Sequence, residues 1–365
     1  MARNCTLLIG ILVLLAAPAL AGDKGFNQAV PGLSLIFPKD HGKHSDFQTE
    51  WWYFTGNLDS ESGRRWGFQV TFFRRALFKQ PRSALSAWNV RDVYPAHFAL
   101  TDVQNSSFFH AELLSREGPD LAKAAEDDLR IHVRDWSATR DNDEIRLTAR
   151  EGGYALDLRL APEKPPVLHG TSGYSRKGDA KDQASYYYSY TRLTATGTIT
   201  FQGTSHQVHG SAWMDHEFGS GMLLANQIGW DWFSLQLDDG SELMVFHLRK
   251  KDGTFEQPFG TFIPKEGAAV DLAGQRILIS SKGTWTSPHT AAIYPSGWTI
   301  EIPEQKISLE ITPLVLDQEL SSERSTRIVY WEGAVEVRGA RNGHPVHGRG
   351  YVELTGYAGS MAGRL

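Results

Sequence analysis

Two aromatic-rich motifs between residues 210 and 237 place acidic groups where water is usually scarce. The first reads GSAWMDHEFG and the second, after a short spacer, reads GWDWFSLQLDDG. Tryptophan side chains tend to be buried, and a buried carboxylate is costly unless it is paired or its pKa is shifted. A carboxyl group that keeps its proton beside an indole ring can act as a proton donor. We therefore expect a site with acid–base chemistry in this region.

Alternation along an extended strand would sort the side chains of residues 205–218 onto two faces. One face would carry His209, Trp213, Asp215 and Glu217. This face could form the wall of a cavity, with Asp215 and Glu217 as candidate catalytic residues and His209 and Trp213 as candidate ligand contacts. The alternative is a solvated strand end whose charges lie in water.

The second motif contributes Trp230 and Trp232, which would share a strand face while Asp231 points the other way. Both tryptophans are candidate ligand contacts. Ordinary core packing with an exposed Asp231 is the competing interpretation, because large aromatic side chains dominate protein cores.

Another acidic residue, Glu50, precedes an aromatic strand that begins with Trp51 and Trp52. Glu50 and Trp52 are candidate ligand contacts. The alternative for Glu50 is a buried ion pair with Arg74 or Arg75.

A run of tyrosines at 186–190 would place Tyr186, Tyr188 and Tyr190 on one face of a strand. Phenol groups can donate hydrogen bonds or protons inside a pocket, so Tyr186 and Tyr188 are candidate catalytic residues. They could equally be ordinary residues of an amphipathic strand.

Metal binding and cofactor chemistry find little support in the motifs. His206 and His209 have an H-x-x-H spacing, with His216 and Glu217 nearby, but on a strand the first two would face opposite ways. No H-E-x-x-H motif, serine-nucleophile elbow, P-loop or dinucleotide fingerprint is present. We expect neither a metal nor a cofactor.

Short alternating runs separated by Gly, Asp and Asn predict an all-β fold. The chain also contains an internal repeat, since WWYFTGNLDSESGRRWGFQVTFFR resembles WDWFSLQLDDGSELMVFHLR. Phe54 aligns with Phe233 and Leu58 with Leu237, at a constant offset of 179 residues (233 − 54). Both segments read as hairpins. We predict two consecutive antiparallel β-barrels, at residues 22–222 and 223–365, whose surplus aromatic residues line a ligand cavity.

The chain begins with Arg3, a short apolar run from Leu7 to Ala17, and Ala19-Leu20-Ala21. This pattern predicts a signal peptide over residues 1–21 and a secreted or periplasmic protein. The only cysteine, Cys5, would be removed with it, so no disulfide is expected. A formal net charge of −5 argues against nucleic acid as a partner.

The ordered motifs resemble the AttH and carotenoid 1,2-hydratase (CrtC) family. They include EWWYFTGNL, HFALTD, SYYYSYTRL, AWMDHEFG, GWDWFSLQLDDG, YWEGAVEV and GYVELTGY. The resemblance implies a pair of lipocalin-like β-barrels, which agrees with the internal repeat. It also implies an apolar isoprenoid or lipid ligand, hydration or cyclisation chemistry, and in exported members an ABC-type exporter as a partner.

Hydration of an unactivated alkene begins with protonation of one carbon and leaves a carbocation. The catalyst needs a carboxylic acid with a raised pKa, aromatic faces that stabilise the cation, and a base for the attacking water. The resemblance assigns the acid role to Asp215, which follows Trp213 as the family's pattern requires.

The chain departs from that pattern at Tyr186-Tyr187-Tyr188. Carotenoid hydratases resemble this chain elsewhere but have a His-x-Trp motif at this position. Tyrosine is a poor base at neutral pH, so the sequence leaves the general base open among Glu50, Glu217 and His209. Three interpretations follow: a hydratase-like enzyme, a carrier of a hydrophobic ligand, and a scaffold without a cavity.

Overall fold

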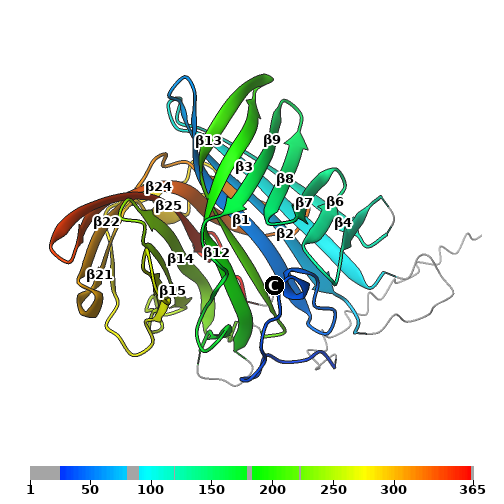
Figure 1. Cartoon of the computed structure of the whole chain (residues 1–365), viewed down its shortest axis with the longest axis horizontal. Helices are drawn as coiled ribbons and strands as arrows, with labels where there is room; N and C mark the ends of the chain where they lie inside the picture. Colours follow the sequence, from blue (N-terminus) through cyan, green and yellow to red (C-terminus); the bar gives the residue numbers. More distant parts are fainter. Residues whose placement is uncertain (1–24, 80–89, 119, 179–182, 222, 363–365) are drawn as a thin grey trace, which may run out of the picture.

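The computed structural model describes residues 25–79, 90–118, 120–178, 183–221 and 223–362. The predicted signal peptide lies outside these residues. Two large antiparallel sheets, one from each half of the chain, lie beside each other (Figure 1). Among the described residues, no helix has the length and apolar character needed to cross a membrane.

The described residues of the first half form a short 3-10 helix and thirteen strands. These elements are η1 (Lys39–His41), β1 (Thr49–Ser60), β2 (Arg65–Ala76), β3 (Asp92–Asp102), β4 (Ser107–Arg116), β5 (Ala122–Ala124), β6 (Arg130–Val133), β7 (Trp136–Asp141), β8 (Glu144–Glu151), β9 (Tyr154–Pro162), β10 (Val167–Leu168), β11 (Tyr174–Arg176), β12 (Ala184–Phe201) and β13 (Thr204–Gly219).

The part of the second half that the structure describes forms twelve strands and a second short 3-10 helix. These elements are β14 (Gln227–Leu237), β15 (Glu242–Lys250), β16 (Phe259–Ile263), β17 (Val270–Asp271), β18 (Leu278–Ser281), β19 (Thr284–Thr286), β20 (Ile293–Pro295), β21 (Trp298–Ile302), η2 (Pro303–Gln305), β22 (Ile307–Pro313), β23 (Glu319–Ser321), β24 (Val329–Arg341) and β25 (His344–Thr355).

The first sheet is a nearly closed barrel. Its strand order is β4-β3-β2-β1-β13-β12-β9-β8-β7-β6-β5, and β6 also contacts β2, β3 and β4 from the far end of the sheet. The second sheet, in the order β17-β16-β15-β14-β25-β24-β22-β21-β18, curves into a half-barrel. The predicted all-β fold of two consecutive lipocalin-like barrels is confirmed.

The internal repeat appears as the same topology in both halves. In the first, β1 lies between β2 and the last strand, β13; in the second, β14 lies between β15 and the last strand, β25. The hairpins β1–β2 and β14–β15 correspond to the two similar sequence segments. The two halves are therefore related element by element around their central strands.

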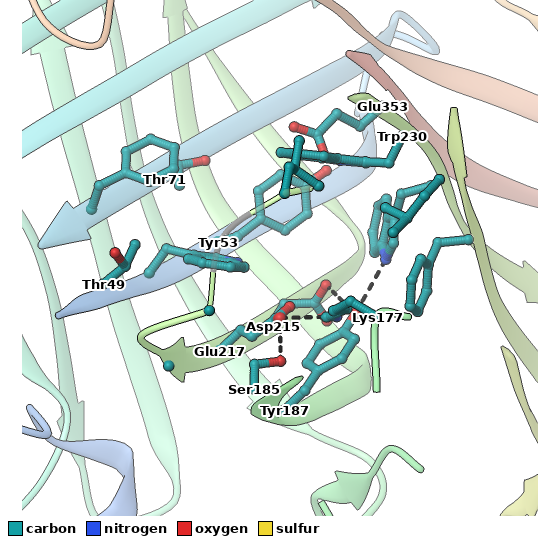
Figure 2. A pocket seen from close by; sticks show the side chains of 18 of the residues that line it. Thr49, Tyr53, Thr71, Lys177, Ser185, Tyr187, Asp215, Glu217, Trp230 and Glu353 are labelled. Carbon is teal, nitrogen blue, oxygen red and sulfur yellow. Dashed lines mark hydrogen bonds and ion pairs between the residues drawn. The ribbon is translucent and has the colours of Figure 1, made fainter. Parts of the chain in front are cut away.

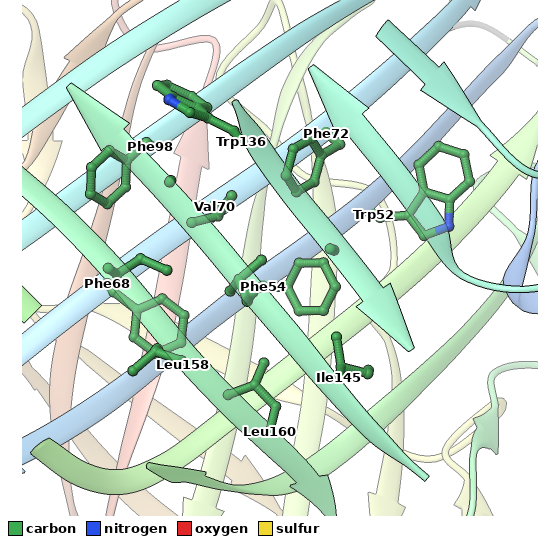
Figure 3. Packing of buried hydrophobic residues seen from close by; sticks show 14 of the residues in the cluster. Trp52, Phe54, Phe68, Val70, Phe72, Phe98, Trp136, Ile145, Leu158 and Leu160 are labelled. Atoms are coloured by element: carbon green, nitrogen blue, oxygen red, sulfur yellow. The ribbon is translucent and has the colours of Figure 1, made fainter. Parts of the chain in front are cut away.

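Alternating side chains fill the first barrel with large aromatic and aliphatic groups (Figure 3). Phe54 on β1, Phe68 and Phe72 on β2, and Trp136 on β7 are fully buried. Each buried side chain of this size contributes about 1.5–3 kcal/mol through removal of apolar surface from water. The second barrel has its own core, which includes Phe233 and Trp298.

A third apolar cluster joins the two halves. Tyr53, Tyr187 and Trp213 from the first half pack with Trp232 and Phe246 from the second. Side chains on this side of β1 and β13 thus point away from the first barrel and toward the second sheet.

The halves approach closely beside this cluster. A Cβ atom at Gly67 on β2 would lie 2.8 Å from the Cβ of Ala334 and 2.9 Å from the hydroxyl of Tyr351. Arg349 on β25 also forms an ion pair with Asp59 on β1, with Nη1 2.5 Å from Oδ2. Close packing and polar contacts fix the geometry of the space between the sheets.

Candidate functional site

A cavity of about 180 Å³ lies between the two sheets, where the third apolar cluster is located. Strands β1, β2, β12 and β13 line it from one side, and β14, β15, β24 and β25 from the other (Figure 2). Most of its lining is aromatic or acidic. These residues include Trp51, Tyr53, Phe73, Tyr187, Asp215, Glu217, Trp230, Trp232, Phe246, Tyr330, Glu332 and Glu353.

Asp215 is a carboxyl group that can hold a proton at neutral pH. Its side chain faces the cavity and is buried, and burial raises its pKa to about 7. Three donors partly oppose that rise: Ser189 Oγ, the Tyr187 hydroxyl 2.7 Å from Oδ2, and Trp213 Nε1 2.6 Å from Oδ1. The charge of nearby Glu217 also raises the pKa of Asp215. Asp215 can therefore donate a proton and take one back near pH 7.

Strand register places these donors. Ser189 on β12 lies directly opposite Asp215 on β13, and Tyr187 lies opposite Glu217. Because alternate residues of a strand share a face, Tyr187 and Ser189 point to the same side as Asp215. Trp213 lies two residues before Asp215 on the same strand and shares that side as well.

Buried polar groups behind Asp215 hold Ser189 in place. His169 Nε2 lies 2.7 Å from Ser189 Oγ, and His169 Nδ1 lies 2.8 Å from Thr261 Oγ1. Burial, together with the charge of Lys177, lowers the pKa of His169 to about 3. The histidine is thus neutral at pH 7, with one ring nitrogen a donor and the other an acceptor. No sequence pattern had predicted a role at the site for His169, Ser189 or Tyr187.

Glu217 also faces the cavity, but it is held in an ion pair. Lys177 Nζ lies 2.9 Å from Glu217 Oε1, and Ser185 Oγ donates to the same oxygen at 2.5 Å. The ammonium group also lies 4.8 Å from the ring centre of Tyr187 and 4.4 Å from that of Phe246. This arrangement suits Glu217 to positioning Lys177 rather than to donating a proton.

Two more carboxyl groups line the opposite side of the cavity. Glu353 on β25 accepts a hydrogen bond from Trp230 Nε1 at 2.7 Å, and Glu332 on β24 lies directly across from Glu353 in the strand pair. Burial raises the pKa of Glu353 to about 7, with the charges of Asp215 and Glu217 adding to it. Burial and the charge of Glu353 raise the pKa of Glu332 well above its usual range.

Neither Glu332 nor Glu353 was predicted as a site residue from the sequence. The sequence signal that singled out Glu50, an acidic residue within an aromatic strand, is also present at these two positions. Glu332 lies in YWEG and Glu353 lies in YVEL.

The two predicted tryptophans of the second motif do lie in the cavity. Trp232 Nε1 donates to the hydroxyl of Tyr187 at 3.1 Å, and the Trp232 ring meets that of Tyr53 edge to face with centres 5.3 Å apart. Trp230 lies beside Glu353 at the other side (Figure 2). Asp231 points the other way, toward His247 and Tyr357.

Tyr186 and Tyr188 lie on the opposite face of β12 from Asp215. Tyr188 donates to or accepts from His41 and His216, with its hydroxyl 2.7 Å and 3.1 Å from their Nδ1 atoms. Tyr186 donates to the backbone carbonyl of Val30 at 2.8 Å. Alternation alone does not say which face of the tyrosine run meets the neighbouring sheet, and in the structure that face carries Tyr187.

Glu50, Trp52 and His209 also lie outside the cavity. Glu50 forms the buried ion pair that was the alternative interpretation, with Arg74 Nε 2.9 Å from Oε2. Trp52 is buried in the first barrel and donates to the carbonyl of His41. His209 is exposed to solvent.

One group of residues has the spacing of a metal site. The possible ligand atoms of His44, Glu50 and His216 lie within 4.8 Å of one another. Although burial opposes it, the charge of Arg74 with the hydrogen bonds of His216 and His44 holds the pKa of Glu50 well below its usual range. The guanidinium already neutralises this carboxylate, so the geometry fits an ion-pair network better than a cation site.

The fold and the site define a two-barrel protein with an acidic, aromatic cavity between its halves. A family model of AttH-like proteins matches residues 28–357, so the chain belongs to the AttH-like family. A solved structure from Nitrosomonas europaea that is assigned to AttH is 38% identical, with a TM-score of 0.82; the match covers 91% of this chain and 100% of that one.

More distant structures share the fold. Kievitone hydratase from Nectria haematococca is 15% identical over 92% of this chain and 98% of its own, with a TM-score of 0.68. CghA is 16% identical over 93% of this chain and 98% of its own, with a TM-score of 0.54. None of the curated proteins matches the chain. The fold is thus one that hydratase-type proteins also use.

Proposed function

We propose that this protein protonates an isolated C=C bond of a hydrophobic ligand and thereby hydrates or isomerises it, with Asp215 as the acid and no cofactor. The observation that carries the proposal is a buried carboxyl group with a pKa of about 7 that faces an aromatic cavity. A carboxylic acid of this kind is the group that alkene protonation needs.

Protonation of an alkene carbon leaves a positive charge on its neighbour. The rings of Tyr53, Trp230 and Trp232 line the cavity and can face that charge, each contributing about 0.5–2 kcal/mol through cation–π attraction. The Asp215 carboxylate left behind is stabilised by the hydrogen bonds from Tyr187 and Trp213. Both products of the proton transfer thus find partners at the site.

The family resemblance supports an isoprenoid as the ligand, and the fold shared with kievitone hydratase supports hydration as the reaction. A hydrophobic tail of the ligand would find apolar surface on Phe73, Phe246 and Leu248. Export through the signal peptide and delivery to or from an ABC-type exporter belong to this proposal as expectations from the sequence.

A non-catalytic carrier is the second candidate function, because the same aromatic cavity would bind a lipid or isoprenoid without reaction. The two functions differ in what they require of Asp215. A catalyst needs its proton, whereas a carrier needs only its shape and polarity.

The test is Asp215→Asn in the mature protein, with (3-methylbut-2-enyl)benzene and kievitone as trial alkenes. A hydratase yields the tertiary alcohol, and the variant loses turnover by at least about a thousandfold while ligand affinity changes by less than about tenfold. Asp141→Asn, an exposed aspartate, is the matched control. Turnover that survives in Asp215→Asn excludes this acid, and binding without turnover in the wild-type protein supports the carrier.

A further inference from the structure

The two halves present equivalent carboxyl groups to the cavity. Tyr53 on β1 lies opposite Asp215, and Trp232 on β14 lies opposite Glu353. Tyr53 and Trp232 are related by the offset of the internal repeat (232 − 53 = 179). Glu353 therefore occupies in the second half the position that Asp215 occupies in the first.

The correspondence continues around the cavity. Trp51 corresponds to Trp230, and Thr71 to Phe246, which lie opposite Tyr53 and Trp232 in the two hairpins. All four of these residues line the cavity. Corresponding faces of the two sheets therefore line the cavity from its two sides. Asp215 and Glu353 lie on these two sides of the same cavity (Figure 2).

The surroundings of the two carboxyl groups differ in one important way. The residue across from Asp215 is Ser189, a donor, whereas the residue across from Glu353 is Glu332, a second acid. Trp230 donates to Glu353, but Oε1 of Glu332 does not meet hydrogen-bond geometry with any described residue. Glu332 is 3% exposed, so this oxygen is a buried acceptor at the cavity.

Tyr53 stands between the two acid sites. Its hydroxyl does not meet strict hydrogen-bond geometry with any described residue, but it lies close enough to Glu332 to interact with that carboxyl group directly. Burial, followed by the charges of Glu332 and Glu353, raises the pKa of Tyr53 well above its usual range. A water molecule that joins Tyr53 and Glu332 would satisfy both groups and would lie inside the cavity. The two side chains thus form a polar part of the cavity wall beside Glu353, where the water that the reaction consumes would find hydrogen-bond partners.

We propose that Glu353, with Glu332 as its positioning partner, is the base of the reaction and works across the cavity from Asp215. This proposal rests on the proposed function. The Asp215 O–H bond breaks as a C–H bond forms, and the alkene's π electrons supply that bond. Water then forms the C–O bond to the carbocation and passes one proton to the Glu353 carboxylate. A proton transfer through solvent from Glu353 to Asp215 restores the starting state.

The decisive experiment compares Glu353→Gln with Asp215→Asn, using (3-methylbut-2-enyl)benzene in D2O. Asp215→Asn is expected to lose both the tertiary alcohol and deuterium incorporation into recovered alkene. Glu353→Gln is expected to lose at least about a hundredfold in alcohol formation while deuterium incorporation persists, because Asp215 still protonates reversibly. Alcohol formation that stays near the wild-type rate in Glu353→Gln overturns the proposal and leaves Asp215 as the acid.

Two controls separate the chemistry from the fold. Glu319→Gln alters a buried glutamate outside the cavity, which accepts from Tyr294 and Ser287, and should leave both readouts unchanged. Glu332→Gln keeps a neutral hydrogen-bonding side chain beside Glu353, so alcohol formation should fall less than in Glu353→Gln, while deuterium incorporation persists.

A measurement without substrate decides the case if no trial alkene reacts. Carboxyl-labelled glutamate allows Glu353 to be titrated by carbon-13 NMR in the wild-type protein, with Glu353→Gln used for assignment. Titration between pH 6 and 8 supports a group that can take and return a proton. A Glu353 that stays ionised down to pH 5, or neutral up to pH 9, overturns the proposal.

Discussion

Trp232 Nε1 lies 3.1 Å from the hydroxyl of Tyr187, and that hydroxyl lies 2.7 Å from Oδ2 of Asp215. Trp232 belongs to the second sheet, while Tyr187 and Asp215 belong to the first. A hydrogen-bond chain thus crosses the boundary between the halves and ends on the proposed acid. The protonation equilibrium of Asp215 depends on contacts from both halves.

Removal of the Tyr187 hydroxyl tests this chain. Tyr187→Phe deletes a hydrogen bond that favours the carboxylate, so the pKa of Asp215 should rise by about one unit above its value near 7. Carbon-13 NMR of labelled aspartate measures the shift. Tyr186→Phe is the matched control, because its hydroxyl bonds to Val30 on the opposite face. Equal shifts in both variants would contradict the assignment.

Asp215 should also leave a signature in stability. In the folded protein it keeps its proton to about pH 7, whereas in the unfolded chain it loses it near its ordinary pKa of 3.8. Between these values the folded state binds more protons, so this residue lowers the free energy of unfolding as pH rises, by up to about 1.4 kcal/mol per unit. In urea unfolding between pH 4 and 7, the free energy of unfolding of Asp215→Asn should therefore increase relative to that of the wild type as the pH rises. A constant difference would contradict the raised pKa.

The buried ion pairs of Arg74 predict a large loss of stability. Arg74 is fully buried and contacts both Glu50 and Asp92, with Nη1 3.1 Å from Asp92 Oδ1. Arg74→Met leaves two buried carboxylates without their main partner and should cost about 3–5 kcal/mol. Arg146→Met removes an exposed pair with Asp157 and should cost less than about 1 kcal/mol. Denaturant unfolding at pH 7 compares the two; similar losses would contradict the network.

A cation should bind the cavity better than its uncharged isostere, because the proposed reaction passes through a carbocation. We expect (2-hydroxyethyl)trimethylammonium to bind at least about tenfold more tightly than 3,3-dimethylbutan-1-ol at pH 8, through the aromatic rings and ionised carboxyl groups. The preference should shrink toward pH 6, since protonation of Asp215 and Glu353 removes their charge. Calorimetry measures both ligands, and equal affinities at pH 8 would argue against cation stabilisation.

The periodicity of the sequence was sufficient to predict the fold class and to group the residues that line one wall of the cavity. Alternation along β13 correctly separates Trp213, Asp215 and Glu217 from His216, because the strand is regular through these positions. The hairpin repeat likewise matches the observed topology. Local patterns of this kind survive because each strand has one face on a barrel core.

The remainder of the site depends on contacts between distant segments. Strand β12 contains a bulge between Tyr190 and Leu193, and the parity that brings Tyr187 toward the second sheet follows from tertiary packing. Glu332 and Glu353 reach the cavity only because β24 and β25 lie next to β14. His169 acts from a loop after β10, more than forty positions before Asp215 in the chain. No local pattern in the sequence predicts that these distant residues meet at one cavity.

The matched faces of the two halves have a consequence for how such a cavity can arise. A chain of half this length that paired with a second copy of itself about a two-fold axis would enclose a similar space. Both of its carboxyl groups would then be identical, and neither could specialise. Joining the copies into one polypeptide frees each side to change separately, which is how a serine could come to face Asp215 while a glutamate faces Glu353.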